Sequence, residues 1–151
     1  MAYRHTQIGW AMILILGLII AILAGAAAAQ SGGFASVVVL SVIILLAVCL
    51  VLFISQTVIV DDEHIELRMG LGFIHRSVPI VDVEAVDRER LPWWAVAYGI
   101  RMSVDGKRQL WRVSGSETVD LRLSGERRLL ITTDEPDALA TVIRSAVESN
   151  R

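Results

Sequence analysis

The first polar cluster whose residue types could do chemistry is Asp61-Asp62-Glu63-His64, which combines three carboxylates with an imidazole. These side chains are of types that bind metal ions, but a metal site needs ligands that converge from spaced positions. Adjacent residues on a strand or turn point in alternating directions, and acidic residues are common in turns. The run therefore favours a solvated turn between two strands, and we expect neither a metal nor another cofactor.

Other residues that could carry catalysis do not form a recognisable pattern. His64 and His75 have no serine or cysteine partner in a known arrangement. Ser114-Gly115-Ser116 differs from the G-x-S-x-G turn of hydrolases. Gly70-x-Gly72 lacks the third glycine and the following helix of a phosphate-binding loop. We therefore expect a protein that is not an enzyme.

Five basic side chains are candidates for contact with anionic lipid head groups, which are bound through charge-assisted hydrogen bonds. They are Arg68, Arg76, Lys107, Arg108 and Arg112. The first two flank a predicted turn, and the other three lie close to a second one. Neither group is dense, so solvated charge at turns is the simpler interpretation. Weak binding of anionic lipid is the alternative.

Two adjacent tryptophans, Trp93 and Trp94, follow Pro92 in a predicted loop. Three environments suit them. They could lie at a membrane interface, where amphipathic rings are favoured. They could instead cap the core of a small sheet, or form a contact between protomers, since aromatic residues are enriched at interface hot spots.

The elements that must position these residues fall into two parts of different composition. Of the 14 Lys and Arg and the 16 Asp and Glu residues, all but Arg4 follow Val60. Uncharged, mostly apolar runs cover residues 8–29 and 35–54, and each is long enough to cross a bilayer as a helix. The short turn between them predicts an antiparallel transmembrane hairpin over residues 8–55, after an N-terminal tail of residues 1–7.

Small residues recur every four positions in the first apolar run, at Gly17, Ala21, Gly25 and Ala29. This spacing places them on one face of a helix, where two backbones can approach closely. We favour packing of this face against the second helix of the same hairpin. A contact between protomers is the alternative.

The few charges near the apolar runs predict the orientation in the membrane. The N-terminal tail carries Arg4 and His5, whereas the loop between the runs carries no charge. The positive-inside bias places the N-terminus in the cytoplasm and, after two crossings of the cytoplasmic membrane, the C-terminal domain as well. Ala26–Ala29 also offers a signal-peptide cleavage pattern, but the apolar run exceeds the usual ~7–15 residues of such a peptide.

Residues 57–151 are predicted to form short strands and one helix. Apolar and polar residues alternate over residues 64–69, 100–105 and 118–123, and further strands are expected at 57–60, 78–86, 111–113 and 129–132. About seven antiparallel strands in a rolled sandwich or barrel result. A C-terminal helix capped by Asp134 follows, with an apolar stripe of Leu139, Val142, Ile143, Ala146 and Val147. The near balance of charge in this half argues against a nucleic-acid-binding protein.

Several segments of this half resemble the bacterial PH-domain proteins. They are Arg76–Ile80, Pro92–Trp94, Tyr98–Arg101, Val113–Gly115, Val119–Leu123 and Thr133–Leu139. The segments extend over nearly all of the soluble half, and the strand that ends in Thr-Asp-Glu-Pro before the helix is the most specific of them. The resemblance to this family, whose small membrane-anchored members are common in actinobacteria, implies a PH-like domain of about seven strands and one C-terminal helix. It implies no particular ligand, since the members mostly lack an assigned biochemical role.

Together these features predict a non-enzymatic, membrane-anchored interaction module. Its PH-like domain would bind a protein partner or a second copy of itself at the cytoplasmic surface of the membrane. An accessory subunit of a larger membrane complex and a weak anionic-lipid-binding module are the alternatives. A transporter is not expected, because the apolar runs contain no Asp, Glu, Lys, Arg or His for an ion or proton path.

Overall fold

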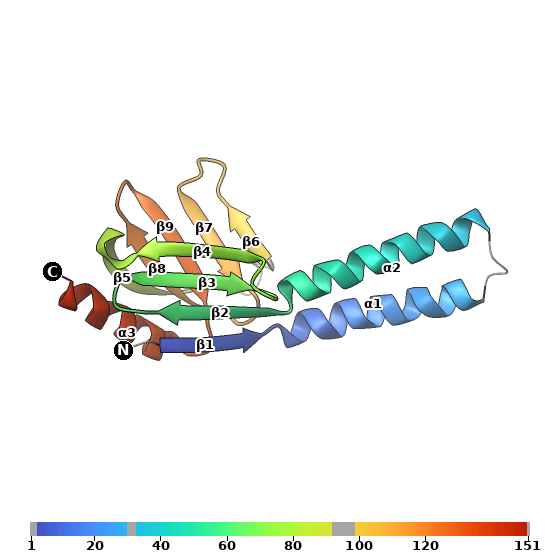
Figure 1. Cartoon of the computed structure of the whole chain (residues 1–151), viewed down its shortest axis with the longest axis horizontal. Helices are drawn as coiled ribbons and strands as arrows, with labels where there is room; N and C mark the ends of the chain where they lie inside the picture. Colours follow the sequence, from blue (N-terminus) through green and yellow to red (C-terminus); the bar gives the residue numbers. More distant parts are fainter. Residues whose placement is uncertain (1–2, 30–32, 92–98, 151) are drawn as a thin grey trace.

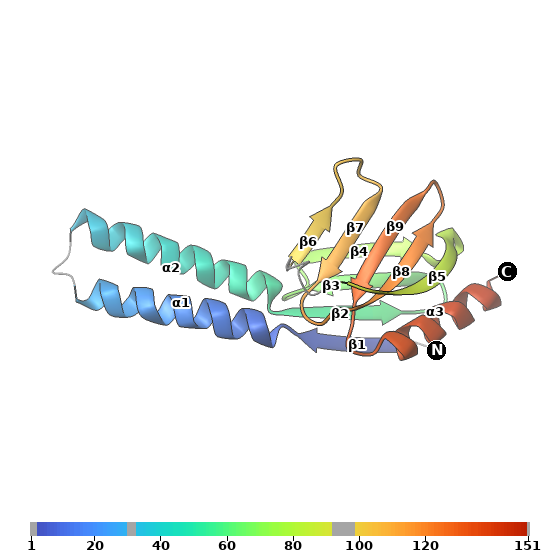
Figure 2. The ribbon, with the colours of Figure 1, turned by 180° about the vertical axis from the view of Figure 1, so that it is seen from behind.

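Two long helices extend from one end of a two-sheet β domain in the computed structural model, which describes residues 3–29, 33–91 and 99–150 (Figure 1). Helix α1 covers Trp10–Ala28, and α2 covers Phe34–Phe53. The two run side by side in opposite directions (Figure 2). Both are long and apolar enough to cross a membrane. The predicted helix pair is confirmed, and its ends lie within two residues of the predicted spans.

The less exposed residues of each helix recur at spacings of three and four, which indicates the seam between the helices. In α1 they include Leu16, Ile20, Leu23 and Ala27, and in α2 they include Ser36, Val39, Ile43, Leu46 and Leu50. None of the residues of α1 or α2 is fully buried. Most of the surface of the hairpin is therefore apolar and uncovered.

The expectation of an N-terminal tail over residues 1–7 is wrong for the residues that the structure describes, because Tyr3–Ile8 form strand β1. Strand β1 pairs antiparallel with β2 (Ser55–Val60), from Tyr3 opposite Val60 to Ile8 opposite Ser55. The helical hairpin is thus an insertion between two neighbouring strands of one sheet. The segment escapes prediction because Ile8 is its only strongly apolar residue and its partner strand lies beyond the whole hairpin.

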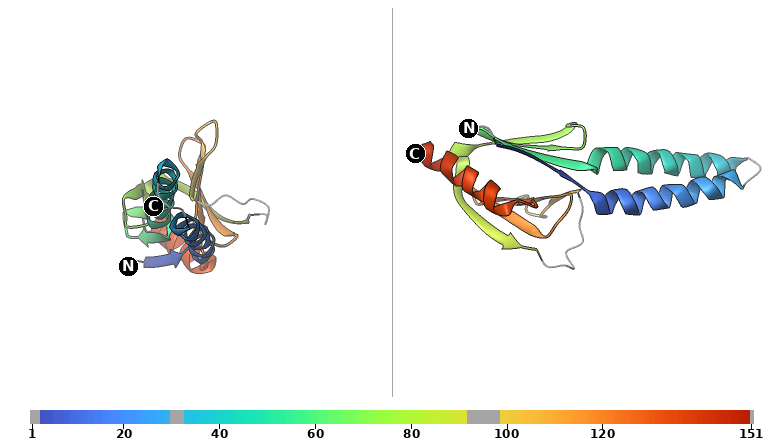
Figure 3. Two further views of the ribbon diagram at one scale, coloured as in Figure 1. Left: turned by 90° about the vertical axis from the view of Figure 1, so that its right-hand side faces the viewer. Right: turned by 90° about the horizontal axis from the view of Figure 1, so that it is seen from below.

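Two sheets make up the described β domain (Figure 3). The first has the order β1-β2-β3-β4, and the second has the order β5-β8-β9-β7-β6. The remaining strands are β3 (His64–Met69), β4 (Ile74–Pro79), β5 (Val83–Arg90), β6 (Gly99–Met102), β7 (Arg108–Arg112), β8 (Glu117–Leu123) and β9 (Arg127–Thr132). All pairings are antiparallel except β7 with β9, which are parallel. The expected two-layer β architecture is present, with eight described strands after the hairpin rather than about seven, and with β1 before it.

The single strand expected over residues 78–86 is instead divided. Strand β4 ends at Pro79, and a short 3-10 helix over Ile80–Asp82 turns the chain into β5 in the other sheet. Proline has no N–H group to continue the ladder, so a strand readily ends there. Ile80 is buried at this corner. The apolar run therefore belongs to two strands in two sheets.

The C-terminal helix α3 (Pro136–Ser149) closes the space between the sheets (Figure 3). Leu139 and Ile143 of the predicted apolar stripe are fully buried, and the other three stripe residues pack partly buried against the same core. The helix starts with Pro136 in its first turn, and Glu135 occupies the capping position. The expected cap, Asp134, is thus one residue too early, and its carboxylate contacts His5 instead.

Candidate functional site

The helices are joined tightly to the β domain at a place that we call the hairpin base, formed by Gly9, Ile54, Ser55 and Gly70. The Gly9 N–H donates to the Ile54 carbonyl at 2.8 Å, and the Gly70 N–H donates to the Ser55 carbonyl at 2.7 Å. A Cβ on Gly70 would lie 2.5 Å from the Leu52 carbonyl oxygen. Only glycine permits such close packing of the β3–β4 turn on the last turn of α2.

The small-residue face of α1 does not pack against α2. A Cβ placed on Gly17 or on Gly25 would meet no described heavy atom within 4 Å, apart from the helix's own neighbouring backbone. The seam runs instead through larger residues such as Leu16 and Ile20. The favoured interpretation, packing of Gly17, Ala21, Gly25 and Ala29 within the hairpin, is therefore wrong for Ala21, Gly25 and Ala29, which are exposed. Gly17 is half-buried, but it has no described neighbour near its Cβ position.

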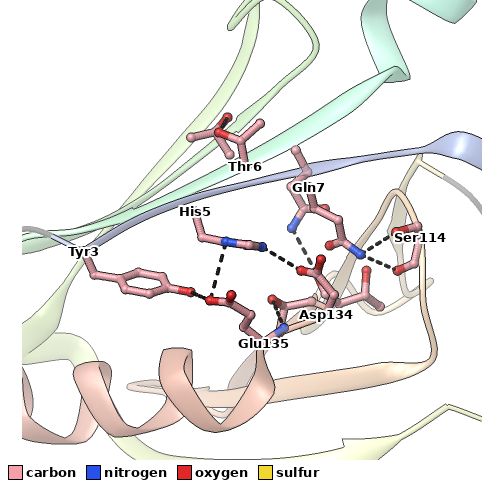
Figure 4. Close-up of polar contacts among 11 residues, drawn as sticks. Tyr3, His5, Thr6, Gln7, Ser114, Asp134 and Glu135 are labelled. Carbon is pink, nitrogen blue, oxygen red and sulfur yellow. Dashed lines mark hydrogen bonds and ion pairs between the residues drawn. The ribbon is translucent and has the colours of Figure 1, made fainter.

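Polar side chains of β1 attach the N-terminal strand to the start of α3 (Figure 4). His5 Nε2 lies 2.6 Å from Asp134 Oδ1, and His5 Nδ1 lies 3.5 Å from Glu135 Oε2. The Tyr3 hydroxyl donates to Glu135 Oε2 at 3.3 Å. Partial burial, and then the negative charge of Glu135, raise the pKa of Tyr3 to about 12. Gln7 completes the set by donating from Nε2 to the Ser114 carbonyl at 3.2 Å.

A groove with a volume of about 290 Å³ lies on the second sheet. Arg101 is paired with Leu110, and Leu110 is paired with Leu130, so these three side chains share one face. Leu130 stands between the core residues Leu129 and Ile131 on β9, which places that face opposite the core. The described lining residues are Leu91, Arg101, Met102, Ser103, Arg108, Leu110 and Leu130. The groove therefore has an apolar floor bordered by two arginines, and we call it the arginine groove.

The charge of the arginine groove is not neutralised within the described part of the chain. Arg101 and Arg108 are both exposed. Neither has an ion pair or a side-chain hydrogen bond with a residue that the structure describes, whereas Arg122, on the same sheet, pairs with Asp87 at 2.7 Å. Guanidinium groups bind carboxylates and phosphates through paired hydrogen bonds. The groove is chemically suited to a ligand that combines apolar and acidic groups.

The five basic residues singled out from the sequence do not converge. Arg68 forms an ion pair with Glu66, Lys107 forms one with Glu126, and Arg112 is buried. The Arg76 side chain donates to Gln109 Oε1 across the two sheets. Burial, with a smaller contribution from the charge of Arg127, lowers the pKa of Arg76. Of the five, Arg108 alone lines the arginine groove.

The acidic segment Asp61–His64 forms the predicted turn between β2 and β3. The Asp61 carboxylate accepts hydrogen bonds from the backbone N–H groups of Glu63 and His64, at 2.9 and 2.6 Å, and these bonds lower its pKa. Within the described ranges, no group of three or more His, Cys, Asp or Glu side chains is arranged to hold a metal ion. Trp93 and Trp94 lie outside the described residues.

Arg101 and the leucines of the groove were not among the predicted site residues. Alternation in the sequence does place Arg101 on the face opposite Ile100. The sequence contains no signal that brings this face beside Leu110 and Leu130, because that proximity depends on the pairing of β6 with β7 and on the parallel pairing of β7 with β9.

The chain was compared with known proteins by sequence. No protein-family model matches it, and a search of curated proteins finds no match either.

Proposed function

We propose that the protein is a non-enzymatic, membrane-anchored interaction module whose PH-like domain binds a protein partner at the cytoplasmic surface of the membrane. In this proposal α1 and α2 cross the cytoplasmic membrane, with both termini and the β domain in the cytoplasm. Two packed sheets and a closing C-terminal helix support the PH-like assignment. The parallel β7–β9 pair departs from the purely antiparallel arrangement that the resemblance implies.

The observation that carries the proposal is the insertion of the apolar hairpin between β1 and β2. Because Ile8 pairs with Ser55, the residues before α1 and after α2 lie side by side. Two crossings with both ends on one side follow naturally from this register. The contacts of the hairpin base leave no flexible linker between α2 and the domain. A domain held in this way would stay at the membrane surface, where an adaptor acts.

The composition of the arginine groove favours a partner with acidic and apolar side chains. Leucines supply apolar area, and two arginines without described partners supply positive charge. Charge complementarity of this kind favours one class of partner over another. We propose that the groove binds an acidic amphipathic peptide segment of a partner protein.

Binding can be measured with two synthetic probes, a peptide of alternating leucine and glutamate and the same peptide with lysine in place of glutamate. The full-length protein in lipid nanodiscs is expected to bind only the acidic peptide. Arg101→Glu and Arg108→Glu are each expected to weaken that binding roughly tenfold or more, because each removes a charge-assisted contact. Arg122→Glu makes the same change of charge away from the groove and should have little effect. Equal binding of both peptides, or equal effects of all three variants, would contradict the proposal.

The orientation is tested by labelling single cysteines in intact cells. Cys49, the only native cysteine, is first replaced by serine. An impermeant maleimide added outside is expected to label Phe34→Cys, at the far end of the hairpin, and to leave Val104→Cys, on the β domain, unlabelled. The reverse pattern would show that the domain lies outside the cytoplasm.

The outward face of Gly17 and Gly25 favours a second candidate, an accessory subunit of a larger membrane complex. Small residues on an uncovered helix face allow another helix to approach closely. Gly17→Leu and Gly25→Leu are expected to abolish a cross-linked complex in native membranes, while the β domain stays folded. Ala26→Leu, which also introduces a leucine but lies outside the four-residue repeat, is the control. Unchanged cross-linking in both glycine variants would remove this candidate.

A further inference from the structure

Two large apolar side chains are exposed on the β3–β4 turn, where a soluble domain would ordinarily carry polar residues. Leu71 and Phe73 are each 73% exposed. The turn lies at the end of the domain from which the helices extend, beside the base of α2 (Figure 1). Exposed leucine and phenylalanine at such a place need an apolar environment of some kind.

The turn is held in this position by Gly70. Its backbone packs against the carbonyls of Val51 and Leu52, and its N–H group donates to the Ser55 carbonyl. Gly72 N–H donates to the Met69 carbonyl at 3.0 Å and tightens the turn. The apolar tip cannot turn away from α2 without breaking the hairpin base.

Phe73 forms one side of a groove of about 360 Å³ along α2. The other lining residues are Ile44, Ala47, Val48, Val51 and Leu52. Ile44 lies roughly 14 Å along the helix axis from the end of α2, at ~1.5 Å per residue. The groove therefore extends well into the part of α2 that would lie in hydrocarbon, and every described side chain that lines it is apolar.

A polar band follows directly behind the apolar tip. Arg68 and His75 are cross-strand neighbours and are both exposed. Arg68 also pairs with Glu66 at 2.8 Å. An apolar tip followed by basic and polar side chains is the order in which a membrane presents its layers, hydrocarbon first and head groups next.

We propose that the β3–β4 turn is a third membrane anchor, in which Leu71 and Phe73 enter the hydrocarbon beside α2 and lipid acyl chains fill the groove. The inference rests on the proposed membrane crossing of α2. Continuity argues for lipid as the occupant, because α2 itself forms most of the groove wall and would be surrounded by acyl chains. An anchor at this point, together with the two helix ends, fixes the tilt of the domain on the membrane.

Site-directed spin labelling tests the depth of the turn. In the Cys49→Ser background, nitroxides are attached at Phe73→Cys, at Leu45→Cys on α2, and at Val81→Cys, an exposed apolar position (75% exposed) on the corner between β4 and β5. The full chain is placed in nanodiscs of zwitterionic and anionic phospholipid. Collisions with oxygen report hydrocarbon, and collisions with a water-soluble nickel chelate report water.

The labels at residues 73 and 45 are expected to collide with oxygen and not with nickel, and the label at residue 81 should show the opposite. Nickel access at residue 73 with oxygen access at residue 45 would overturn the third anchor and leave the membrane crossing intact. Nickel access at residue 45 would overturn the crossing itself. A label at residue 73 that neither reagent reaches would show a protein in the groove and overturn lipid as the occupant.

Discussion

Two pairs of glycines in and beside the helical hairpin have opposite surroundings. At the hairpin base, a Cβ on Gly9 would lie 2.8 Å from Val113 Cγ1, and one on Gly70 would lie 2.5 Å from the Leu52 carbonyl oxygen. Within α1, a Cβ on Gly17 or Gly25 would meet no described neighbour within 4 Å. The first pair builds a tight joint inside one chain. The second leaves a surface that no described residue covers.

The strongest test of this contrast is Gly70→Ala. The new Cβ would overlap backbone atoms of α2, and Gly70 also has a positive φ of 58°. We expect a loss of roughly 3 kcal/mol or more in the free energy of unfolding, from overpacking together with the left-handed backbone. For a domain of this size, the midpoint of thermal unfolding should fall by roughly 10 °C or more.

Gly72→Ala is the matched control for this change. Gly72 also has a positive φ, but the nearest described atom to its Cβ is the flexible Arg68 Cδ at 4.0 Å. Gly72→Ala should therefore lower the midpoint of thermal unfolding clearly less than Gly70→Ala does. Equal effects would show that backbone conformation, rather than contact with α2, makes Gly70 necessary.

Gly9→Ala is expected to have the next largest effect. The φ of Gly9 is −81°, which alanine adopts readily, so the effect is steric. Overlap with Val113 should cost about 1–2 kcal/mol. The double variant Gly9→Ala with Val113→Ala should be less destabilised than the sum of the single variants, since the smaller side chain makes room. Strict additivity in chemical unfolding would contradict the tight joint.

Gly17→Leu should change the stability of the isolated chain by no more than about 0.5 kcal/mol, because the new Cβ would have no described atom within 4 Å. The measurement is thermal unfolding in detergent, where no partner helix is present. A loss as large as that of Gly9→Ala would show that the glycine face of α1 packs within the hairpin after all.

The smallest expected effect concerns Tyr3, on the strand that precedes the hairpin. Its pKa is raised from 10.0 to about 12 in the folded chain, so folding favours the protonated phenol. This contribution to stability is complete below pH 10.0 and is lost as the pH rises toward about 12. In the Tyr98→Phe variant, which leaves Tyr3 as the only tyrosine, tyrosinate absorbance should titrate with a midpoint near 12.

Glu135→Gln removes the negative charge beside the phenol and is expected to move that midpoint part of the way back, since burial, the largest single cause of the raised pKa, remains. An unshifted midpoint near 10.0 in the folded protein would contradict the contact between β1 and α3.

The helices and most strands could be predicted because their signals are local. Uncharged runs specify α1 and α2, and alternation of the kind at Ile65, Leu67 and Met69 specifies strands with one buried face. The stripe on α3 is equally local. Strand β1 gives no such signal, since its residues are stabilised by β2 and by Asp134 and Glu135 rather than by their own pattern.

The candidate sites depended almost entirely on pairing between distant segments. Arg108 was selected from the sequence as a basic residue near a turn, but its neighbours in the arginine groove were not. Arg76 was selected for the same reason, and the structure directs it inward to Gln109. The face of a strand can be read from alternation, whereas the strand that lies beside it cannot.

An apolar helix pair, a β domain of mixed charge and a closing amphipathic helix could all be inferred from the amino-acid sequence. These follow from hydropathy and periodicity, which are properties of neighbouring residues. Three features could be seen only in the folded chain: the hairpin interrupts a sheet, Gly17 and Gly25 have no neighbour near their Cβ positions, and the β3–β4 turn places Phe73 beside α2. Those outcomes depend on strand register and on the rotation of a helix about its axis, which are set by contacts between residues far apart in the chain.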